Sequence, residues 1–183
     1  VKVKHIISRL EKNGYEAYAV GGCVRDSVLD RVPEDWDITT SAKPEEVKKL
    51  FTATIDTGLQ HGTVTVVIEK EGYEVTTFRL DGDYSDGRHP DRVAFTSSLT
   101  EDLKRRDFTI NAMAYSEKTG LIDRFDGEKD LEYGIIRAVG DAEERFSEDA
   151  LRMLRAIRFA GQLNFDISEK TLYAIKKLSP NIS

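Results

Sequence analysis

Glu34-Asp35-Trp36-Asp37-Ile38-Thr39-Thr40 joins two carboxylates to a run of apolar and β-branched residues. The run favours a β-strand, in which successive side chains point to opposite faces. Asp35 and Asp37 are therefore expected on one face, about 7 Å apart along the backbone. At that spacing two carboxylates can converge on a pair of divalent metal ions roughly 3.5–4 Å apart. The alternative is a strand face whose acids are simply solvated, because the Asp-x-Asp pattern alone is weakly specific.

A pair of glycines, Gly21 and Gly22, precedes this stretch. Strand-forming residues at 15–20 lead into the pair, and a helix-like segment at 24–30 follows it. Glycines between a strand and a helix let the backbone approach a phosphate, and the helix start offers free N–H groups. Arg25 would add a bidentate phosphate contact. The alternative is a Gly-Gly turn that serves chain geometry only; a P-loop is excluded because the Gly-Lys-Ser/Thr ending is absent.

These motifs occur in the order Gly21-Gly22-x-x-Arg25-Asp26, then Asp35-x-Asp37. In that order the sequence resembles the head domain of tRNA nucleotidyltransferases, the CCA-adding enzymes of the bacterial and eukaryotic type, and of the related bacterial poly(A) polymerases. Further segments that match the same family are Glu74–Arg79, Asp86–Pro90, Arg105–Ala114 and Arg145–Arg152. The resemblance runs in order from about residue 15 to about residue 165.

The resemblance implies an α+β fold, with a DNA polymerase β-like nucleotidyltransferase head whose small mixed sheet is flanked by helices. We expect the head at residues 1–140 and the first helices of an all-α neck at 141–183, in a chain that is truncated relative to the full-length enzyme. The implied reaction is template-independent addition of C and A from CTP and ATP to the 3′ end of tRNA. In it Asp35 and Asp37 hold two Mg²⁺ ions, and the 3′-hydroxyl attacks the α-phosphate in line while pyrophosphate leaves.

Glu74 is a candidate third carboxylate. It lies near the start of a strand predicted at 73–80. If that strand lies beside Asp35 and Asp37, Glu74 can ligate metal or accept the proton of the attacking hydroxyl. The alternative is a solvent-facing glutamate.

Arg105, Arg106 and Asp107 follow a helix predicted to begin at Thr100, its expected N-cap. As a pattern the triplet is typical of a solvated helix end. The resemblance implies instead that Arg106, with Arg105 as a second candidate, contacts the triphosphate and that Asp107 contacts the ribose hydroxyl. Asn111 lies in the same motif, and its role stays open.

A helix predicted at 145–163 carries Asp149 and Arg152. One alternative is that they form only a helix ion pair at i, i+3, worth roughly 0.2–0.5 kcal/mol. The resemblance implies that they hydrogen-bond the edge of the incoming base in place of a template, a role that suits an arginine with fixed donors beside a carboxylate acceptor. We expect the buried stripe of this helix to be Ala150, Met153, Leu154 and Ile157.

Charge and composition limit the range of partners. A net charge of −6 argues against a wide nucleic-acid surface, because phosphate binding needs clustered cations. Local groups such as Arg152, Arg155 and Arg158 suit a triphosphate or a strand end, so Arg155 and Arg158 join the candidate nucleotide-binding set. Without a signal peptide or an apolar run of roughly 20 residues, and with a single cysteine, we expect a cytoplasmic protein with no membrane partner.

The remaining elements are read from periodicity and turn residues. Further helices are expected at 2–12, 41–51, 127–133 and 171–178, further strands at 63–69, 121–124 and 135–139, a tight turn at 70–72 and a loop at 81–92. In the resembled family this loop helps to switch nucleotide choice, which favours an enzyme able to add A.

Rival functions stay open. Within the family they are an A-adding enzyme that extends tRNA ending in CC, and a poly(A) polymerase. Outside it they are a metal-dependent Asp-x-Asp glycosyltransferase, which leaves the Arg-Arg-Asp and Glu-Asp-x-x-Arg segments unexplained, and a non-catalytic nucleotide-binding module, against which the intact carboxylate pair counts.

Overall fold

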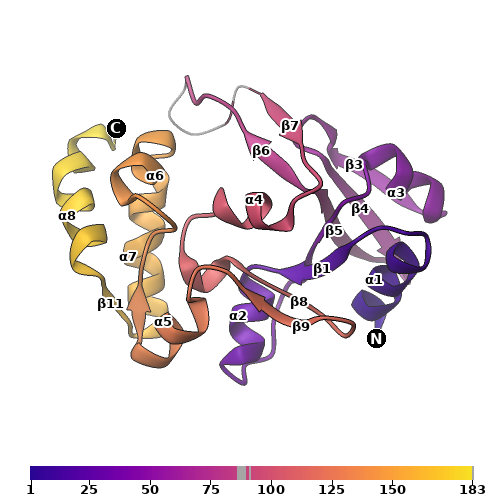
Figure 1. Ribbon diagram of the computed structural model, residues 1–183, viewed down its shortest axis with the longest axis horizontal. Coiled ribbons are helices and arrows are strands. Elements are labelled where there is room, and N and C mark those ends of the chain that lie inside the picture. The colour runs from indigo at the N-terminus through magenta and orange to yellow at the C-terminus, as the bar shows by residue number, and fades with distance from the viewer. Residues whose placement is uncertain (86–89, 91, 183) are drawn as a thin grey trace.

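The structure is a computed structural model that describes residues 1–85, 90 and 92–182. A mixed sheet lies at its centre, with helices on both faces and at one end (Figure 1). In the described residues the sheet has seven strands in the order β3-β4-β5-β2-β1-β8-β9. Their bounds are β1 Ala17–Val20, β2 Asp37–Thr40, β3 Thr54–Gly58, β4 Thr63–Ile68, β5 Glu71–Thr77, β8 Met113–Ser116 and β9 Gly120–Asp123. The expected α+β class is confirmed.

Helices and short strands complete the molecule. The helices are α1 Lys2–Lys12, α2 Gly22–Val28, α3 Pro44–Leu50, α4 Leu99–Lys104, α5 Gly127–Tyr133, α6 Ala142–Glu148, α7 Leu151–Leu163 and α8 Glu169–Leu178. The short strands are β6 Arg79–Asp81 with β7 Val93–Phe95, and β10 Ile135–Ile136 with β11 Asp166–Ile167. Within the described part of the chain, no helix is long and apolar enough to span a membrane.

Strand β2 and its parallel neighbour β5 give the sheet its polar and apolar faces. The register sets Asp37 beside Glu74 and Ile38 beside Val75. Because side chains alternate along a strand, the two acids share one face and the two apolar residues share the other. Ile38 and Val75 are buried in the main core, which also holds apolar residues of α1 and α3. The acids are therefore left on the opposite face.

Helix α4 covers part of that opposite face. Leu99 and Leu103 of α4 pack with Tyr18 and Val20 of β1 in a second core cluster. The ring of Phe78, which follows β5, is fully buried in the same cluster and stacks on Tyr18 at 6.4 Å between ring centroids. This packing fixes the segment that carries Arg105 and Arg106 over the face that bears the acids.

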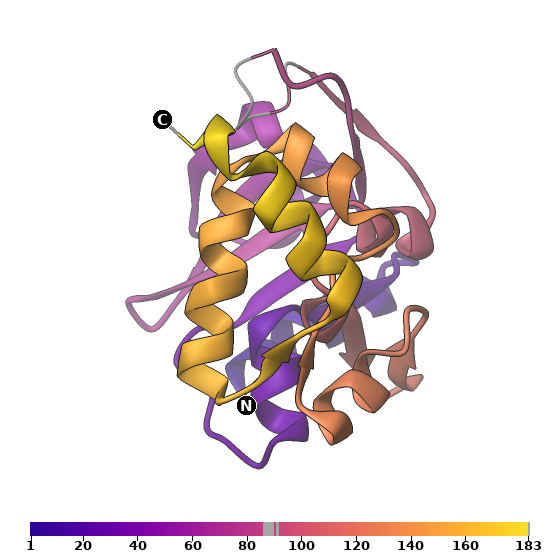
Figure 2. The same cartoon turned by 90° about the vertical axis from the view of Figure 1, so that its left-hand side faces the viewer.

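Residues beyond 140 form helices that pack against one end of the sheet, where α7 and α8 face the viewer in Figure 2. Met153, Ala156 and Phe159 of α7 are buried in the main core. The Phe159 ring meets Phe108 edge to face, with 5.9 Å between ring centroids. A single hydrophobic cluster thus links α7 to the segment that follows α4.

The helix expected at 145–163 is wrong in two respects. It is broken into α6 and α7, because Asp149 leaves the helical region (φ −141°, ψ 103°) and its carboxylate accepts the N–H of Leu151 at 3.0 Å. Such side-chain capping competes with a continuous helix. The expected core positions Leu154 and Ile157 are 47% and 53% exposed, since α7 turns Met153 and the stripe that follows it toward the core instead.

Smaller differences are local. The hairpin between β4 and β5 turns at Glu69 and Lys70, both with positive φ, one residue before the expected turn. Ser98, not Thr100, caps α4. Strand β2 begins at Asp37, so Asp35 lies in the bend before it. In the loop expected at 81–92, residues 86–89 and 91 lie outside the described residues, and with them most of the predicted motif at 86–90.

Candidate active site

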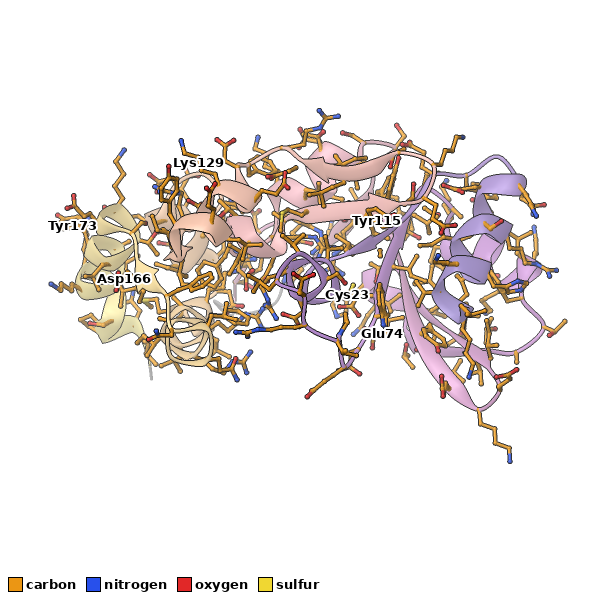
Figure 3. The ribbon with its side chains drawn as sticks, turned by 90° about the horizontal axis from the view of Figure 1, so that it is seen from below. Cys23, Glu74, Tyr115, Lys129, Asp166 and Tyr173 are labelled. Carbon is orange, nitrogen blue, oxygen red and sulfur yellow. The ribbon has the colours of Figure 1, made fainter. Side chains whose placement is uncertain are left out.

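Asp37 lies at the first position of β2, directly beside Glu74 on β5. Burial raises the pKa of the Asp37 carboxyl, the charge of Asp35 raises it further, and the Arg106 guanidinium opposes the shift. Burial also raises the pKa of Glu74, and the charges of Asp37 and Asp35 add to it. Glu74 is labelled in Figure 3, which shows the sheet from below. The three acids thus repel one another across a short stretch of the polar face.

A cation would relieve this repulsion. In the described residues no group of three or more His, Cys, Asp or Glu is arranged to hold a metal ion, so the acids do not form a complete cage. Mg²⁺ does not need one, because it is commonly bound by one or two carboxylates together with water and substrate phosphates. The pair Asp35 and Asp37, with Glu74 beside it, fits that kind of site.

Arg106 lies between the acids and the glycine turn. Gly21 has a φ of +80°, which an L side chain rarely adopts, and a Cβ built on it would stand 3.6 Å from Nη1 of Arg106. Nη2 of Arg106 donates to Asp102 at 3.3 Å, while its buried Nε has no hydrogen-bond partner in the described part of the chain. Arg106 therefore places a partly unsatisfied guanidinium next to Gly21 and close to Asp37.

A chain of polar contacts runs from the start of α2 to α7. Nη1 of Arg25 donates to Oδ1 of Asn111 at 2.8 Å, and Nδ2 of Asn111 donates to Oδ1 of Asp107 at 3.3 Å. The other oxygen of Asp107 pairs with Nη2 of Arg155 at 2.7 Å. Arg25 also pairs with its neighbour Asp26 at 2.8 Å. Asn111, whose role the sequence leaves open, is thus the link between the Gly-Gly-x-x-Arg and the Arg-Arg-Asp motifs.

Three arginine side chains pack around the Phe159 ring. The guanidinium carbons of Arg25, Arg155 and Arg158 each lie 5.2 Å from its centroid, within the range of cation–π contact. Arg155 and Arg158 are exposed, whereas the Arg25 side chain is only 12% exposed. Arg158 therefore lies at the rim of the predicted nucleotide-binding set, where its guanidinium is open to solvent.

Arg105, Asp149 and Arg152 meet at a cavity of about 260 Å³. Its wall also includes His61 and Tyr84. The buried Arg152 donates through Nη1 to Glu148 at 2.8 Å and through Nη2 to the carbonyl of Arg105 at 3.3 Å. The carboxylate of Asp149 and the guanidinium of Arg152 therefore line one hollow, on the side of α4 that faces α6 and α7.

Some residues of the site escape the sequence motifs. Asp102 is fully buried beneath both arginines, and the i, i+3 and i, i+4 spacings to Arg105 and Arg106 are the signal that points to it. Tyr84 lies 6.0 Å from the Arg152 guanidinium carbon, measured to its ring centroid, and no sequence pattern marks it. A larger hollow of about 1040 Å³ lies elsewhere, against Ile7, Val24 and Trp36, and the described residues that line it include none of the predicted site residues.

Known proteins match the chain along all or nearly all of its length. The CCA-adding enzyme of Leuconostoc mesenteroides is 55% identical over 183 residues, which is 100% of this chain and 46% of the relative. That of Lactiplantibacillus plantarum is 59% identical over 172 residues, 94% of this chain and 42% of the relative. The chain therefore spans less than half the length of these curated relatives.

Solved structures agree with the sequence relatives. The CCA-adding enzyme of Bacillus stearothermophilus in complex with CTP has a TM-score of 0.89 at 50% identity, over 98% of this chain and 44% of that one. A tRNA nucleotidyltransferase complexed with a primer tRNA and an incoming ATP analogue has a TM-score of 0.75 at 34% identity, over 96% of this chain and 50% of that one. Both contain the fold described above.

The family model of the poly A polymerase head domain matches residues 17–137, which include the acids, the glycine turn and the Arg-Arg-Asp motif. This confirms the expected resemblance, and the chain belongs to the poly A polymerase head domain family.

Proposed function

We propose that this chain is the catalytic part of a template-independent nucleotidyltransferase that adds C and A from CTP and ATP to the 3′ end of tRNA. The observation that carries the proposal is the convergence of Asp37, Glu74 and Arg106 beside the Gly21 turn. Support comes from relatives that are named CCA-adding enzymes, and from similar structures that hold CTP or a primer tRNA with an ATP analogue.

The acids serve the metal side of the reaction. Asp35 and Asp37 would hold two Mg²⁺ ions, which, when bound, lower the pKa of the attacking 3′-hydroxyl and neutralise charge on the triphosphate. Glu74 lies beside Asp37 and has a raised pKa, so it is placed to accept a proton from the hydroxyl or to orient a ligand. Because the acids repel one another, a bound cation between them would lower their electrostatic energy.

The arginines and the glycine turn serve the nucleotide. Arg106 offers its guanidinium on the side of Gly21, and Arg25 lies beside Gly22, so that two cations flank the turn where a phosphate would bind. Arg25 is held by Asn111, and Asp107 by Arg155, so that the Asp107 carboxylate is fixed where a ribose hydroxyl can donate to it. Arg158 adds a solvent-exposed cation at the edge.

Base choice belongs to the cavity formed by Arg105, Asp149 and Arg152. An arginine and a carboxylate present donors and acceptors that match the edge of a base. At about 260 Å³ the hollow has room for a base. We propose that Asp149 and Arg152 read C and A there, while the acids act on the phosphate end.

We further propose that residues 1–140 are the catalytic head and that residues 141–183 begin a helical neck. The break between them falls just before α6, after which the chain is helical apart from the short strand β11. The neck contributes Asp149 and Arg152 to the cavity. We place the activity in the cytoplasm, where thiols such as the free, buried Cys23 stay reduced.

A test follows from Asp37. In the full-length protein, Asp37→Ala is expected to reduce incorporation of labelled CMP or AMP into tRNA by at least about a thousandfold, because charge stabilisation of the transition state is lost. The far-UV circular dichroism spectrum should be unchanged. Asp56→Ala, which removes an exposed acid on β3, is the matched control and should keep wild-type turnover. Turnover near wild type in Asp37→Ala would remove the metal assignment.

The family description favours one alternative, a poly(A) polymerase. The same head would then extend an RNA end with A alone. Growth of an open-ended A tract on tRNA that lacks its CCA end supports the polymerase, and a defined CCA end supports the proposal. An enzyme that extends only tRNA ending in CC would be an A-adding partner.

A further inference from the structure

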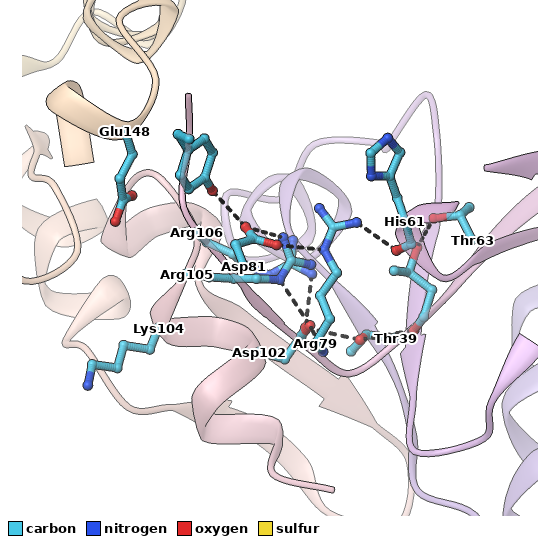
Figure 4. Close-up of polar contacts among 12 residues, drawn as sticks. Thr39, His61, Thr63, Arg79, Asp81, Asp102, Lys104, Arg105, Arg106 and Glu148 are labelled. Carbon is cyan, nitrogen blue, oxygen red and sulfur yellow. Dashed lines mark hydrogen bonds and ion pairs between the residues drawn. The ribbon is translucent and has the colours of Figure 1, made fainter. Parts of the chain in front are cut away.

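Asp102 is a fully buried carboxylate at the centre of the arginine network (Figure 4). Its Oδ2 accepts the hydroxyl of Thr39 at 3.0 Å and Nη2 of Arg106 at 3.3 Å. Its Oδ1 accepts the backbone N–H of Arg79 at 3.1 Å and Nε of Arg105 at 3.2 Å. One side chain of α4 thus contacts β2, β6 and both arginines of the Arg-Arg-Asp motif.

The two arginines leave Asp102 in different directions. Arg106 places its Nη1 beside Gly21, and its charge acts on Asp37. Arg105 lies in the wall of the cavity that also holds Asp149 and Arg152, and its Nη1 is 3.8 Å from Asp81 at the start of the loop. Adjacent cations repel, and a carboxylate between them is what allows both to stay within this partly buried space.

Charge balance supports this arrangement. Burial alone would raise the pKa of Asp102, but Arg105 and Arg106, with donors from Arg79 and Thr39, lower it below its ordinary value. Burial lowers the pKa of Arg106, and attraction to Asp102 opposes that shift. Asp102 is therefore an anion at neutral pH, and its charge offsets the positive charges of Arg105 and Arg106.

Thr39 connects this anion to the catalytic strand. It lies two residues after Asp37 on β2, so that both side chains point to the same face. The hydroxyl bond from Thr39 to Asp102 ties α4 to the strand that carries the acid. Movement of Asp102 would consequently displace the arginines relative to Asp37.

We propose that Asp102 is a positioning residue: its carboxylate aims Arg106 at the triphosphate and Arg105 at the base cavity, in register with Asp37. The inference rests on the proposed function, since it assumes that a nucleotide occupies this cleft. Asp102 itself touches no substrate. Its effect is exerted through Arg106 on the phosphate tail and through Arg105 on the base.

The test compares CTP with CMP, which share a base but differ in phosphate tail. Asp102→Asn keeps the size and one of the two acceptor oxygens, replaces the other oxygen with an NH2 donor and removes the charge. In the full-length protein with Mg²⁺, calorimetric titration should show CTP affinity falling by about tenfold or more, because bonds to charged groups are lost. CMP affinity should fall less, so that the ratio of CTP to CMP affinity decreases. A general loss of stability would lower both affinities by the same factor.

Asp130→Asn is the matched control. Asp130 is 4% exposed, accepts the Thr109 hydroxyl at 2.6 Å and pairs with Nε of Arg137 at 3.1 Å. It is thus another buried acid that holds a threonine and an arginine, and it is not among the residues that line the cavity. Its substitution should lower the melting temperature and leave the CTP to CMP ratio at the wild-type value.

Thr39→Val decides the matter if Asp102→Asn does not fold. It removes one donor to Asp102 and keeps the charge, so the CTP to CMP ratio should fall by about threefold. A wild-type ratio in Thr39→Val, or an equal loss of CTP and CMP affinity in Asp102→Asn, overturns the inference alone. Failure of the wild-type protein to bind CTP would instead contradict the proposed function and, with it, the inference.

Discussion

In their ionised forms, the carboxylates of Asp37 and Glu74 destabilise the folded state. Burial and the neighbouring acids raise their pKa values above those of the unfolded chain. A raised value means that the folded state binds protons more tightly than the unfolded state. Their favourable contribution is therefore complete below the unfolded pKa and is lost as the pH rises through the folded value. At neutral pH the ionised pair destabilises the fold.

This sign predicts a stabilising substitution at Asp37, the proposed metal-binding position. Asp37→Asn should raise the melting temperature of the metal-free protein at about pH 7, where roughly 2–4 °C corresponds to 1 kcal/mol in a chain of this size. The gain should shrink as the pH falls toward the acid range. Scanning calorimetry across pH measures it. Mg²⁺ should stabilise the wild type and not the variant; a lower melting temperature for Asp37→Asn at neutral pH would contradict the account.

Gly21 allows a second prediction from one residue. Gly21→Ala should cost about 1 kcal/mol or more, because alanine is strained at positive φ. It should also weaken CTP binding, since its Cβ would stand beside Arg106. Gly14→Ala is the control: φ is +87° and nothing lies within 4 Å of its Cβ. Both variants should lose stability in urea titrations, and only Gly21→Ala should lose CTP affinity; equal CTP affinities would sink the role of the turn.

Helices whose ends are marked by local residues, such as glycine, have the bounds that the sequence predicts. Helix α1 ends at Lys12, just before Asn13-Gly14, and α5 ends at Tyr133, just before Gly134, and these observed bounds are the predicted ones. Strand β8 was not predicted, because its four residues are held by pairing with β1 and β9 and not by their own pattern. The break at Asp149 was missed because the stretch 145–163 contains no proline, and its only glycine lies near the end.

The capping role of Asp149 yields a prediction at the level of the helix. Asp149→Ala removes the acceptor for the Leu151 N–H and should cost about 1 kcal/mol. Asp141→Ala removes the N-cap of α6, whose carboxylate accepts from Glu144 at 2.9 Å, and should cost a similar amount. Only Asp149→Ala should lose the preference for CTP and ATP over GTP and UTP in incorporation assays. Loss of that preference in both variants would assign it to helix stability and not to Asp149.

Some residues of the candidate site were predicted from sequence motifs, and others were found only in the structure. Asp37, Glu74 and Arg106 come from motifs, and the register of β2 with β5 meets the condition set for Glu74, that its strand lies beside that of Asp37. Asp102 and Tyr84 were not singled out, because their contacts join β2, β6, α4 and α7, which only the tertiary fold brings together. Periodicity describes one element at a time and does not report such contacts.

At the scale of the whole molecule, the larger of the two hydrophobic clusters in the described residues extends from α1 to α8. The net charge is −6, and arginines such as Arg25, Arg105 and Arg106 form ion pairs with acids of the same chain. Such local arginines suit a small phosphate site and not a wide nucleic-acid surface. Paired cations release few counterions from nucleic acid. The chain spans less than half the length of these relatives, and under the proposed function most of the tRNA contacts are expected outside residues 1–183.

The most direct measurement is to sequence the 3′ ends that the full-length protein produces on a tRNA transcript without its CCA end, given CTP, ATP and Mg²⁺. The account predicts that the ends read CCA and stop there, and that Asp37→Ala leaves the transcript unextended. An open-ended A tract, or extension that persists in Asp37→Ala, would contradict it.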